Sequence, residues 1–209
     1  MSENRSLPWI EPTQKRSREK VGRILDATLE LAVAGGSLDV KMTDIARAAD
    51  VAVGTLYQFF PTRSALIAKL FAREMAPIDA SLTEMFRDDP DFDSLAARVE
   101  SLLFQHLQWV QERPGLSIIW GARNLDRDIE FADLENTRRN AAALSERLSS
   151  VMPTPVANGE VYATALLICH LWSSVIRLCA LVEPDERPEL IRQYTSMIVA
   201  QCGALSQHP

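Results

Sequence analysis

MTDIARAADVAVGTLYQFFPTRSALI, residues 42–67, is the stretch of sequence that decides the fold. Its apolar residues recur at helical spacing and predict two short helices, over 41–49 and 53–60, joined by a turn at 50–52. Pro61 ends the second helix, because proline disfavours the helical conformation in the residue before it. The side chains expected to pack between the helices are Ile45, Ala46, Ala49, Leu56 and Phe60, with Val51 filling the turn. Two short helices joined in this way are typical of a helix-turn-helix.

This packing leaves an outward-facing set on the second helix and its approach: Thr43, Ala52, Val53, Gly54, Thr55, Tyr57 and Gln58. A helix presented in this way can enter the DNA major groove with its N-terminus first. Thr55 is suited to a thymine methyl group or a phosphate, and Gln58 carries an amide suited to adenine. Tyr57 can donate a hydrogen bond to a phosphate. The alternatives are that Thr55 and Gln58 face only solvent and that Tyr57 packs in the core with a solvated hydroxyl.

The spacing of this segment resembles the TetR family of bacterial repressors. The matching residues are Ile45-Ala46, Ala49, Val51, Gly54-Thr55-Leu56-Tyr57, Phe59-Phe60, Thr62-Arg63 and Leu66. With the preceding helix, the likeness covers roughly residues 17–70 without gaps. It implies a two-domain layout, homodimerisation through the last two helices and a ligand pocket in the C-terminal domain.

The resemblance also implies which residues meet DNA. The predicted DNA-binding set is Lys41, Thr43, Arg47, Ala52, Val53, Gly54, Thr55, Tyr57, Gln58, Phe59 and Arg63. Arg63 matches the basic residue that meets a phosphate. For Lys41 and Arg47 the favoured interpretation is a plain surface charge, and a phosphate contact is the alternative.

Four positions depart from the family pattern. Asp50 replaces the usual glycine of the turn, which fits the tolerance of aspartate for the left-handed conformation. Ala52 replaces the usual serine and loses a helix cap, and Lys41 stands where a capping threonine is common. Phe59 replaces a histidine or tyrosine that often contacts phosphate. These departures weaken single contacts more than the family assignment.

Working outward from this motif, helical patterns fill the chain. Residues 1–14 are expected to form a disordered tail, and residues 17–34 a helix that ends at Gly35-Gly36. Thr62 is the expected N-cap of the next helix, which Pro77 kinks or interrupts. Further helices are predicted over about 92–113, 116–120, 128–151, 156–181 and 187–205, with Pro114-Gly115 as a break. The expected fold is all-α with about nine helices. Its predicted domains are a helix-turn-helix DNA-binding domain at 15–61 and a helical effector-binding and dimerisation domain at 62–209.

Composition limits the classes of protein that fit. The net charge of −6 argues against a nucleic-acid partner, but residues 1–75 carry 11 Lys and Arg against 9 Asp and Glu, and the remainder carries 11 against 19. A mildly basic N-terminal part on an otherwise acidic protein is compatible with phosphate binding, because the local electrostatic potential at the binding surface matters more than the net charge. The polar N-terminus and the lack of an apolar run of about 18 residues favour a cytoplasmic protein without a membrane partner. Three cysteines without a CxxC pair predict packing residues and no metal or other cofactor.

The second half of the sequence predicts only a type of site. The candidate ligand-pocket residues are Phe86, Phe104, His106, Trp109, Trp120, Asn124 and Trp172, for which a packed core is the alternative. The expected effector is a small apolar or aromatic molecule. The candidate dimer-interface residues are Ala163, Leu167, His170, Ser174, Arg177, Tyr194 and Ile198, for which core burial is the alternative.

The sequence thus predicts a ligand-responsive DNA-binding transcriptional regulator, a repressor that a small hydrophobic effector releases from a palindromic operator. An activator and a ligand-independent nucleoid-type DNA-binding protein are the alternatives of the same class. An enzyme is the rival from another class, and the sequence holds no nucleophile elbow, HExxH motif, phosphate loop or dinucleotide fingerprint.

Overall fold

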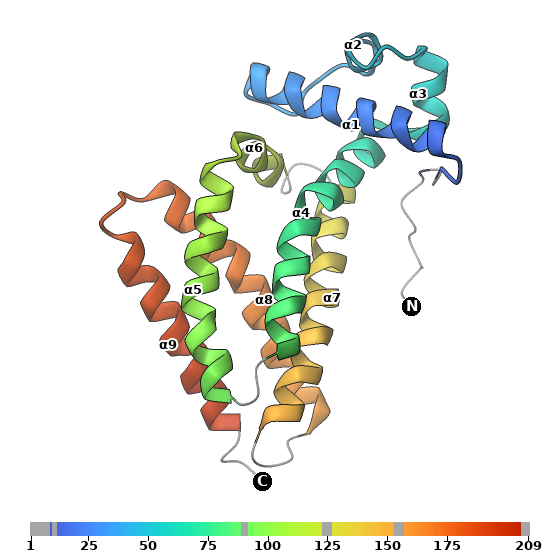
Figure 1. The fold of residues 1–209 in the computed structure, drawn as a ribbon. Helices are drawn as coiled ribbons and strands as arrows, with labels where there is room; N and C mark the ends of the chain where they lie inside the picture. The colour runs from blue at the N-terminus through green and yellow to red at the C-terminus, as the bar shows by residue number, and fades with distance from the viewer. Residues whose placement is uncertain (1–8, 10–11, 89–91, 123–126, 153–156, 206–209) are drawn as a thin grey trace. The chain divides into compact units, whose positions relative to one another are not determined.

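The computed structural model describes residues 9, 12–88, 92–122, 127–152 and 157–205, with side chains described outside 85–97 and 122. Within these ranges every regular element is an α-helix (Figure 1). The helices are α1 (Lys15–Gly35), α2 (Met42–Ala48), α3 (Val53–Phe59), α4 (Arg63–Asp88), α5 (Phe92–Gln111), α6 (Pro114–Ala122), α7 (Arg127–Val151), α8 (Asn158–Leu181) and α9 (Arg187–Leu205). The predicted all-α class and the nine helices are confirmed for the described part of the chain.

The chain forms two compact units. Unit 1 comprises residues 1–75 and 114–133, and unit 2 comprises 76–113 and 134–209. Helices α4 and α7 each contribute residues to both units. Apart from Trp9, Pro12, Thr13 and Gln14, the tail expected at 1–14 lies outside the described residues.

Unit 1 is built around α1, which packs against α2 and α6, while α2 packs against α3. Its apolar face is buried, with Ile24 and Ala32 fully inaccessible to solvent. Gly36 ends α1 in the left-handed conformation at φ 65°, and its N–H reaches the carbonyls of the last turn. The helix stop predicted at Gly35-Gly36 is therefore confirmed.

Helix α6 lies unusually close to α1 within unit 1. Pro114 is its first residue, a position where the missing N–H costs nothing. A Cβ atom on Gly115 would lie 2.4 Å from Leu29 Cδ1 and 3.4 Å from Val33 Cγ2, so a larger residue would displace the Leu29 side chain. The predicted break at Pro114-Gly115 is confirmed, and Gly115 also permits the close approach of the two helices.

In unit 2, α5 packs against α8 and α9, and α8 packs against α9. The Tyr194 hydroxyl of α9 donates a buried hydrogen bond to the carbonyl of Ile168 on α8. On another side, Asp79 of α4 accepts hydrogen bonds from the Asn136 and Asn140 amides of α7, at 3.0 and 2.8 Å. Both apolar packing and polar contacts therefore hold the helices of this unit together.

Helix α4 is continuous through Pro77. Of the two predicted alternatives, a kink or an interruption at Pro77, the interruption is wrong. The φ angle of proline is compatible with a helix, although Pro77 donates no backbone hydrogen bond and its ring crowds the carbonyl four residues earlier. The regular hydrogen bonds on either side are enough to continue the helix.

Candidate DNA-binding surface and effector site

The helix-turn-helix is held by the apolar residues that the sequence singled out. Ile45 and Ala46 of α2 are each 1% exposed, and Ala49 after it is 3% exposed. Leu56 of α3 and Phe60 at its end are fully buried. The predicted packing between the two helices is confirmed, and it fixes which side of α3 faces outward.

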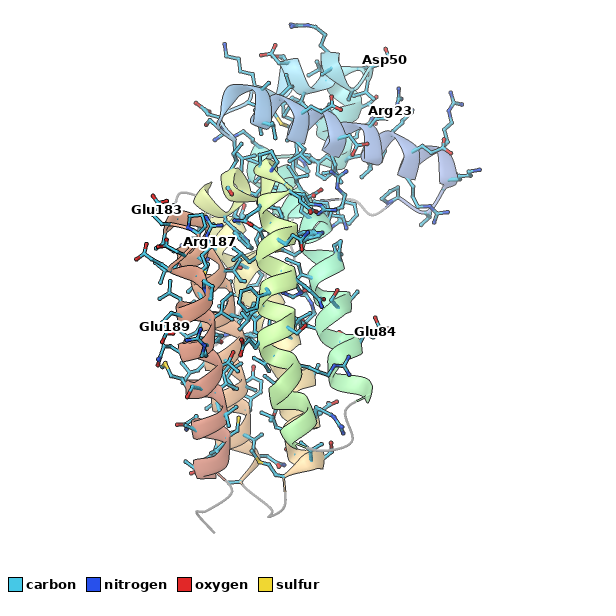
Figure 2. The ribbon with its side chains drawn as sticks, turned by 60° about the vertical axis from the view of Figure 1, so that its left-hand side comes forward. Arg23, Asp50, Glu84, Glu183, Arg187 and Glu189 are labelled. Carbon is cyan, nitrogen blue, oxygen red and sulfur yellow. The ribbon has the colours of Figure 1, made fainter. Side chains whose placement is uncertain are left out.

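The turn between α2 and α3 depends on Asp50. This residue has φ 50°, and it is the one non-glycine residue with positive φ in the described part of the chain. The next residue, Val51, closes the turn by donating its N–H to the Ala46 carbonyl over 3.0 Å. The Asp50 carboxylate lies 3.6 Å from the Arg23 guanidinium of α1, and both residues are labelled in Figure 2. The explanation of why aspartate can replace glycine here is confirmed.

The start of α3 has no side-chain cap. Ala52 is the N-cap residue in an extended conformation, and no side-chain hydrogen bond caps the helix. Lys41 likewise provides no side-chain cap for α2. Thr62 does cap α4, because its hydroxyl accepts a hydrogen bond from the Ala65 N–H over 3.0 Å. The lost caps at positions 41 and 52 and the cap at 62 agree with the sequence prediction.

The outward face of α3 is open to solvent. Tyr57 is 48% exposed and Val53 39% exposed, and Gln58 is also exposed. A Cβ atom on Gly54 would meet nothing within 4 Å. Thr55 is half-buried at the edge of this face. The alternative that Tyr57 packs in the core is therefore wrong, and this face is free to meet a ligand.

The rest of the predicted DNA-binding set also reaches the surface. Lys41, Thr43, Arg47, Ala52 and Arg63 are exposed, and Phe59 is half-buried. Two of the cations already have acidic partners: Arg47 lies 3.2 Å from Asp44, and Arg63 pairs with Asp39. These exposed ion pairs are worth at most about 1 kcal/mol each, so a phosphate can compete for either arginine. We name the α3 face together with these residues the recognition surface.

The indole of Trp9 packs against the end of the helix-turn-helix. Its ring stacks on Phe60 with the centroids 6.1 Å apart and the planes at 11°, and Lys69 Nζ lies 3.9 Å from the Trp9 centroid. Sequence analysis missed this contact, because Trp9 stands alone in a polar segment with no periodic neighbours. The one available signal was an isolated large aromatic residue in that segment.

The structure brings two of the predicted pocket residues together. In unit 2, Trp172 Nε1 donates a hydrogen bond to His106 Nδ1 over 3.0 Å, and both residues are buried. Phe104 is 38% exposed, and Trp109 is half-buried beneath the Arg113 guanidinium. Trp120 is buried within unit 1, while Asn124 and the Phe86 side chain lie outside the described residues.

His106 gives the protein a pH-dependent stability. Burial lowers the pKa of His106 from 6.5 to about 4, so the ring stays neutral in the folded chain while the unfolded chain binds a proton below pH 6.5. The contribution of neutral His106 to the free energy of unfolding is therefore fully present above pH 6.5. It is lost progressively as the pH falls to 4, by ~3 kcal/mol in total. Urea unfolding at pH 7 and pH 4 is expected to show a smaller loss for His106→Gln than for the unmodified chain. His170→Gln, at an exposed histidine, is the control, and an equal loss in all three proteins would contradict the prediction.

One side of α8 exposes a continuous set of apolar side chains. Leu167 is 61% exposed, Leu171 40%, Leu178 45% and Leu181 85%, and their spacing places them on one helix face with Ala163 and Ser174. We name this set the α8 stripe. By length and composition alone, α8 is also apolar enough to cross a membrane. An exposed apolar set of this kind is typical of an interaction surface.

The candidate dimer residues divide between surface and core. Ala163, Leu167 and His170 are exposed, and Ser174 and Arg177 are half-buried. Tyr194 and Ile198 are 5% and 7% exposed, so their placement on an interface is corrected: they belong to the core of unit 2. The apolar periodicity of α9 marked its inner face, whereas Met197, at 62% exposed, faces outward.

The three cysteines lie in unit 2. Cys179 and Cys202 are buried and Cys169 is half-buried, and none of the three forms a disulfide. Burial raises the pKa of Cys169 to about 12 and that of Cys202 to about 11. These residues are therefore protonated and act as small packing groups. Within the described residues, no group of His, Cys, Asp or Glu side chains could hold a metal ion.

Comparison with known proteins gives matches along most of the chain. Residues 24–70 match the family described as bacterial regulatory proteins, tetR family, and residues 93–205 match the tetracyclin repressor-like C-terminal domain. The HTH-type transcriptional repressor KstR of Mycobacterium tuberculosis is 49% identical over 180 residues, which cover 80% of this chain and 74% of that protein. KstR of Rhodococcus jostii is 32% identical over 160 residues, 75% of this chain and 71% of that protein.

A similar fold is found among solved structures. A TetR-family transcriptional regulator from Streptomyces coelicolor superposes with a TM-score of 0.65 at 23% identity, over 91% of this chain and 99% of that chain.

Proposed function

The chain belongs to the TetR family of bacterial transcriptional regulators, and from this premise we propose that it represses its target genes as a homodimer on a pseudo-palindromic operator. A small hydrophobic effector bound in the C-terminal domain releases it. This family consists of DNA-binding regulators, which sets aside the enzyme alternative. The proposed functional domains are 15–61 for DNA binding and 62–209 for effector binding and dimerisation, acting in the cytoplasm.

The observation that carries the DNA-binding part is the open outward face of α3. A buried packing side holds this helix while Tyr57, Gln58 and Gly54 remain accessible. In the proposed complex α3 enters the major groove, where the Gln58 amide reads a base and Tyr57 contacts a phosphate. Arg63 exchanges its partner Asp39 for the DNA backbone.

Dimerisation is supported by the α8 stripe. A single interface with two-fold symmetry would cover the same exposed leucines on both subunits. The two α3 helices would then read half-sites one helical turn apart, at ~34–36 Å. An effector changes this spacing only through its differential affinity for two conformations of the dimer.

The direct test is selection of bound sequences from a random DNA pool, with and without cell extract. The expected result is an inverted repeat with half-sites one helical turn apart, and the extract is expected to weaken binding to the selected DNA in a gel shift. No enrichment would contradict operator binding. Enrichment that no extract or candidate inducer weakens would favour the ligand-independent nucleoid-type alternative.

Gln58→Ala is expected to relax specificity at one base pair of each half-site. The loss of a bidentate amide contact costs ~1–3 kcal/mol of discrimination between the preferred base and the others. Binding isotherms against single-base operator variants measure it. Lys41→Ala is the contrasting variant, because loss of a phosphate contact weakens all sequences equally and lowers the salt dependence by about one unit. Unchanged base preference in Gln58→Ala would contradict the assigned reading residue.

A further inference from the structure

His106 and Trp172 form a polar pair in an apolar part of unit 2. Besides their hydrogen bond, the two rings meet edge to face, with the centroids 5.5 Å apart and the planes at 71°. His106 is 5% exposed and Trp172 is 7% exposed. On the same helix as His106, Leu102, Leu103 and Val110 are buried. The pair is thus shielded from bulk water.

The hydrogen bond from Trp172 fixes the tautomer of His106. An indole nitrogen is a donor only, so Nδ1 of His106 must be the unprotonated, accepting nitrogen. Burial lowers the pKa of His106 to about 4, which keeps the imidazole neutral near pH 7. A neutral imidazole carries a single N–H, and in His106 this N–H is therefore on Nε2.

The Nε2 atom of His106 is buried and has no hydrogen-bond partner among the described residues. A buried donor without an acceptor costs ~1–3 kcal/mol, and folded proteins satisfy nearly all such groups. Its position is fixed by the contact of the ring with Trp172, so the ring cannot turn toward another acceptor without breaking that bond. An acceptor from outside the chain would remove this cost.

We propose that His106 is the polar contact of the effector and that its Nε2–H donates a hydrogen bond to an uncharged carbonyl oxygen on an otherwise apolar molecule. This inference rests on the proposed function, in which an effector binds the C-terminal domain. An anionic group fits this position less well. Removing its hydration costs several kcal/mol, and the neutral imidazole returns only one hydrogen bond.

The site also implies a division of roles between the two residues. His106 touches the effector, whereas Trp172 is a positioning residue that sets the tautomer through Nδ1. Without the Trp172 N–H, His106 can carry its proton on either nitrogen. Part of the population then presents an acceptor at Nε2 and repels a carbonyl oxygen.

The test compares ketones with hydrocarbons of the same skeleton on the full-length protein. The probes are benzophenone with diphenylmethane and 2-undecanone with undecane, and calorimetry or tryptophan fluorescence measures the affinities. At least one ketone is expected to bind about tenfold more tightly than its hydrocarbon, which is the effect of one net hydrogen bond. His106→Phe is expected to erase this preference while leaving hydrocarbon affinity within about twofold, and His106→Gln, which keeps an amide donor, is expected to retain part of it.

Two further variants complete the design. Gln105→Leu removes a polar group from the exposed side of the same helix and is expected to leave the ketone preference unchanged. If His106→Phe does not fold, Trp172→Phe replaces it and is expected to reduce the preference at least threefold.

Three results would overturn the proposal: equal affinities within both probe pairs, a ketone preference that survives in His106→Phe, or no binding of either ketone. The first is also the result expected if a water molecule occupies the position. Failure of the proposed DNA-binding function would be detected independently, because the selection of operator sequences uses neither the ketones nor the hydrocarbons.

Discussion

Leu167→Glu is expected to convert the proposed dimer into monomers, with the dimer dissociation constant raised at least about 1,000-fold. Leu167 is the first leucine of the α8 stripe along the chain, and it is 61% exposed. A two-fold interface buries each substitution twice, so two unpaired carboxylates lose their hydration without gaining partners. A 1,000-fold change corresponds to about 4 kcal/mol, within the cost of burying two such charges.

Operator affinity is expected to fall more than about 100-fold in the same variant, because each monomer then binds its half-site without the help of the second. Analytical ultracentrifugation measures the dimer, and a gel shift on the selected operator measures DNA binding. Leu134→Glu makes the same substitution at a leucine of α7 that is 40% exposed and lies outside the α8 stripe. It is expected to stay dimeric, and a dimeric Leu167→Glu protein would refute the assigned interface.

Phe60→Ala is expected to destabilise the helix-turn-helix by ~3–5 kcal/mol. Phe60 is fully buried and carries the Trp9 ring on its face. The alanine leaves a cavity at the end of α3 and removes the stacking partner of Trp9. Because unit 2 has its own core, the variant is expected to remain a dimer while losing operator binding.

Urea unfolding followed by circular dichroism and tryptophan fluorescence measures this loss of stability. The neighbouring Phe59→Ala is the matched control, because Phe59 is half-buried. It is expected to cost less than half as much stability. Equal losses in the two variants would show that the packing described for Phe60 does not hold the motif together.

The helix-turn-helix was predictable because its constraints are local. Ile45, Ala46 and Leu56 lie within one short stretch, and the distances between them follow from helix geometry alone. The left-handed residue at Asp50 was also predictable, because the family resemblance places a glycine at this turn position and aspartate tolerates the same conformation.

The remaining features depend on contacts between distant parts of the chain. Apolar periodicity marks every buried face of a helix, but it does not distinguish the chain's own core from a surface that a second chain covers. Tyr194 and Ile198 were assigned to an interface for this reason, although they pack inside unit 2. The pairing of His106 with Trp172 is similar, because 66 residues separate them and no local pattern relates their rings.

The close approach at Gly115 has a consequence for how this protein can be divided. A fragment that ends near the start of α4 would lack α6, where Gly115 lies against the Leu29 and Val33 side chains. Both side chains would then be more exposed, including Val33, which is 40% exposed in the intact chain, and the truncated DNA-binding domain is expected to aggregate or to fold poorly. The DNA-binding domain is therefore not expected to fold on its own when it is moved into a fusion protein. Such a fusion would also need α6, which comes from the middle of the sequence.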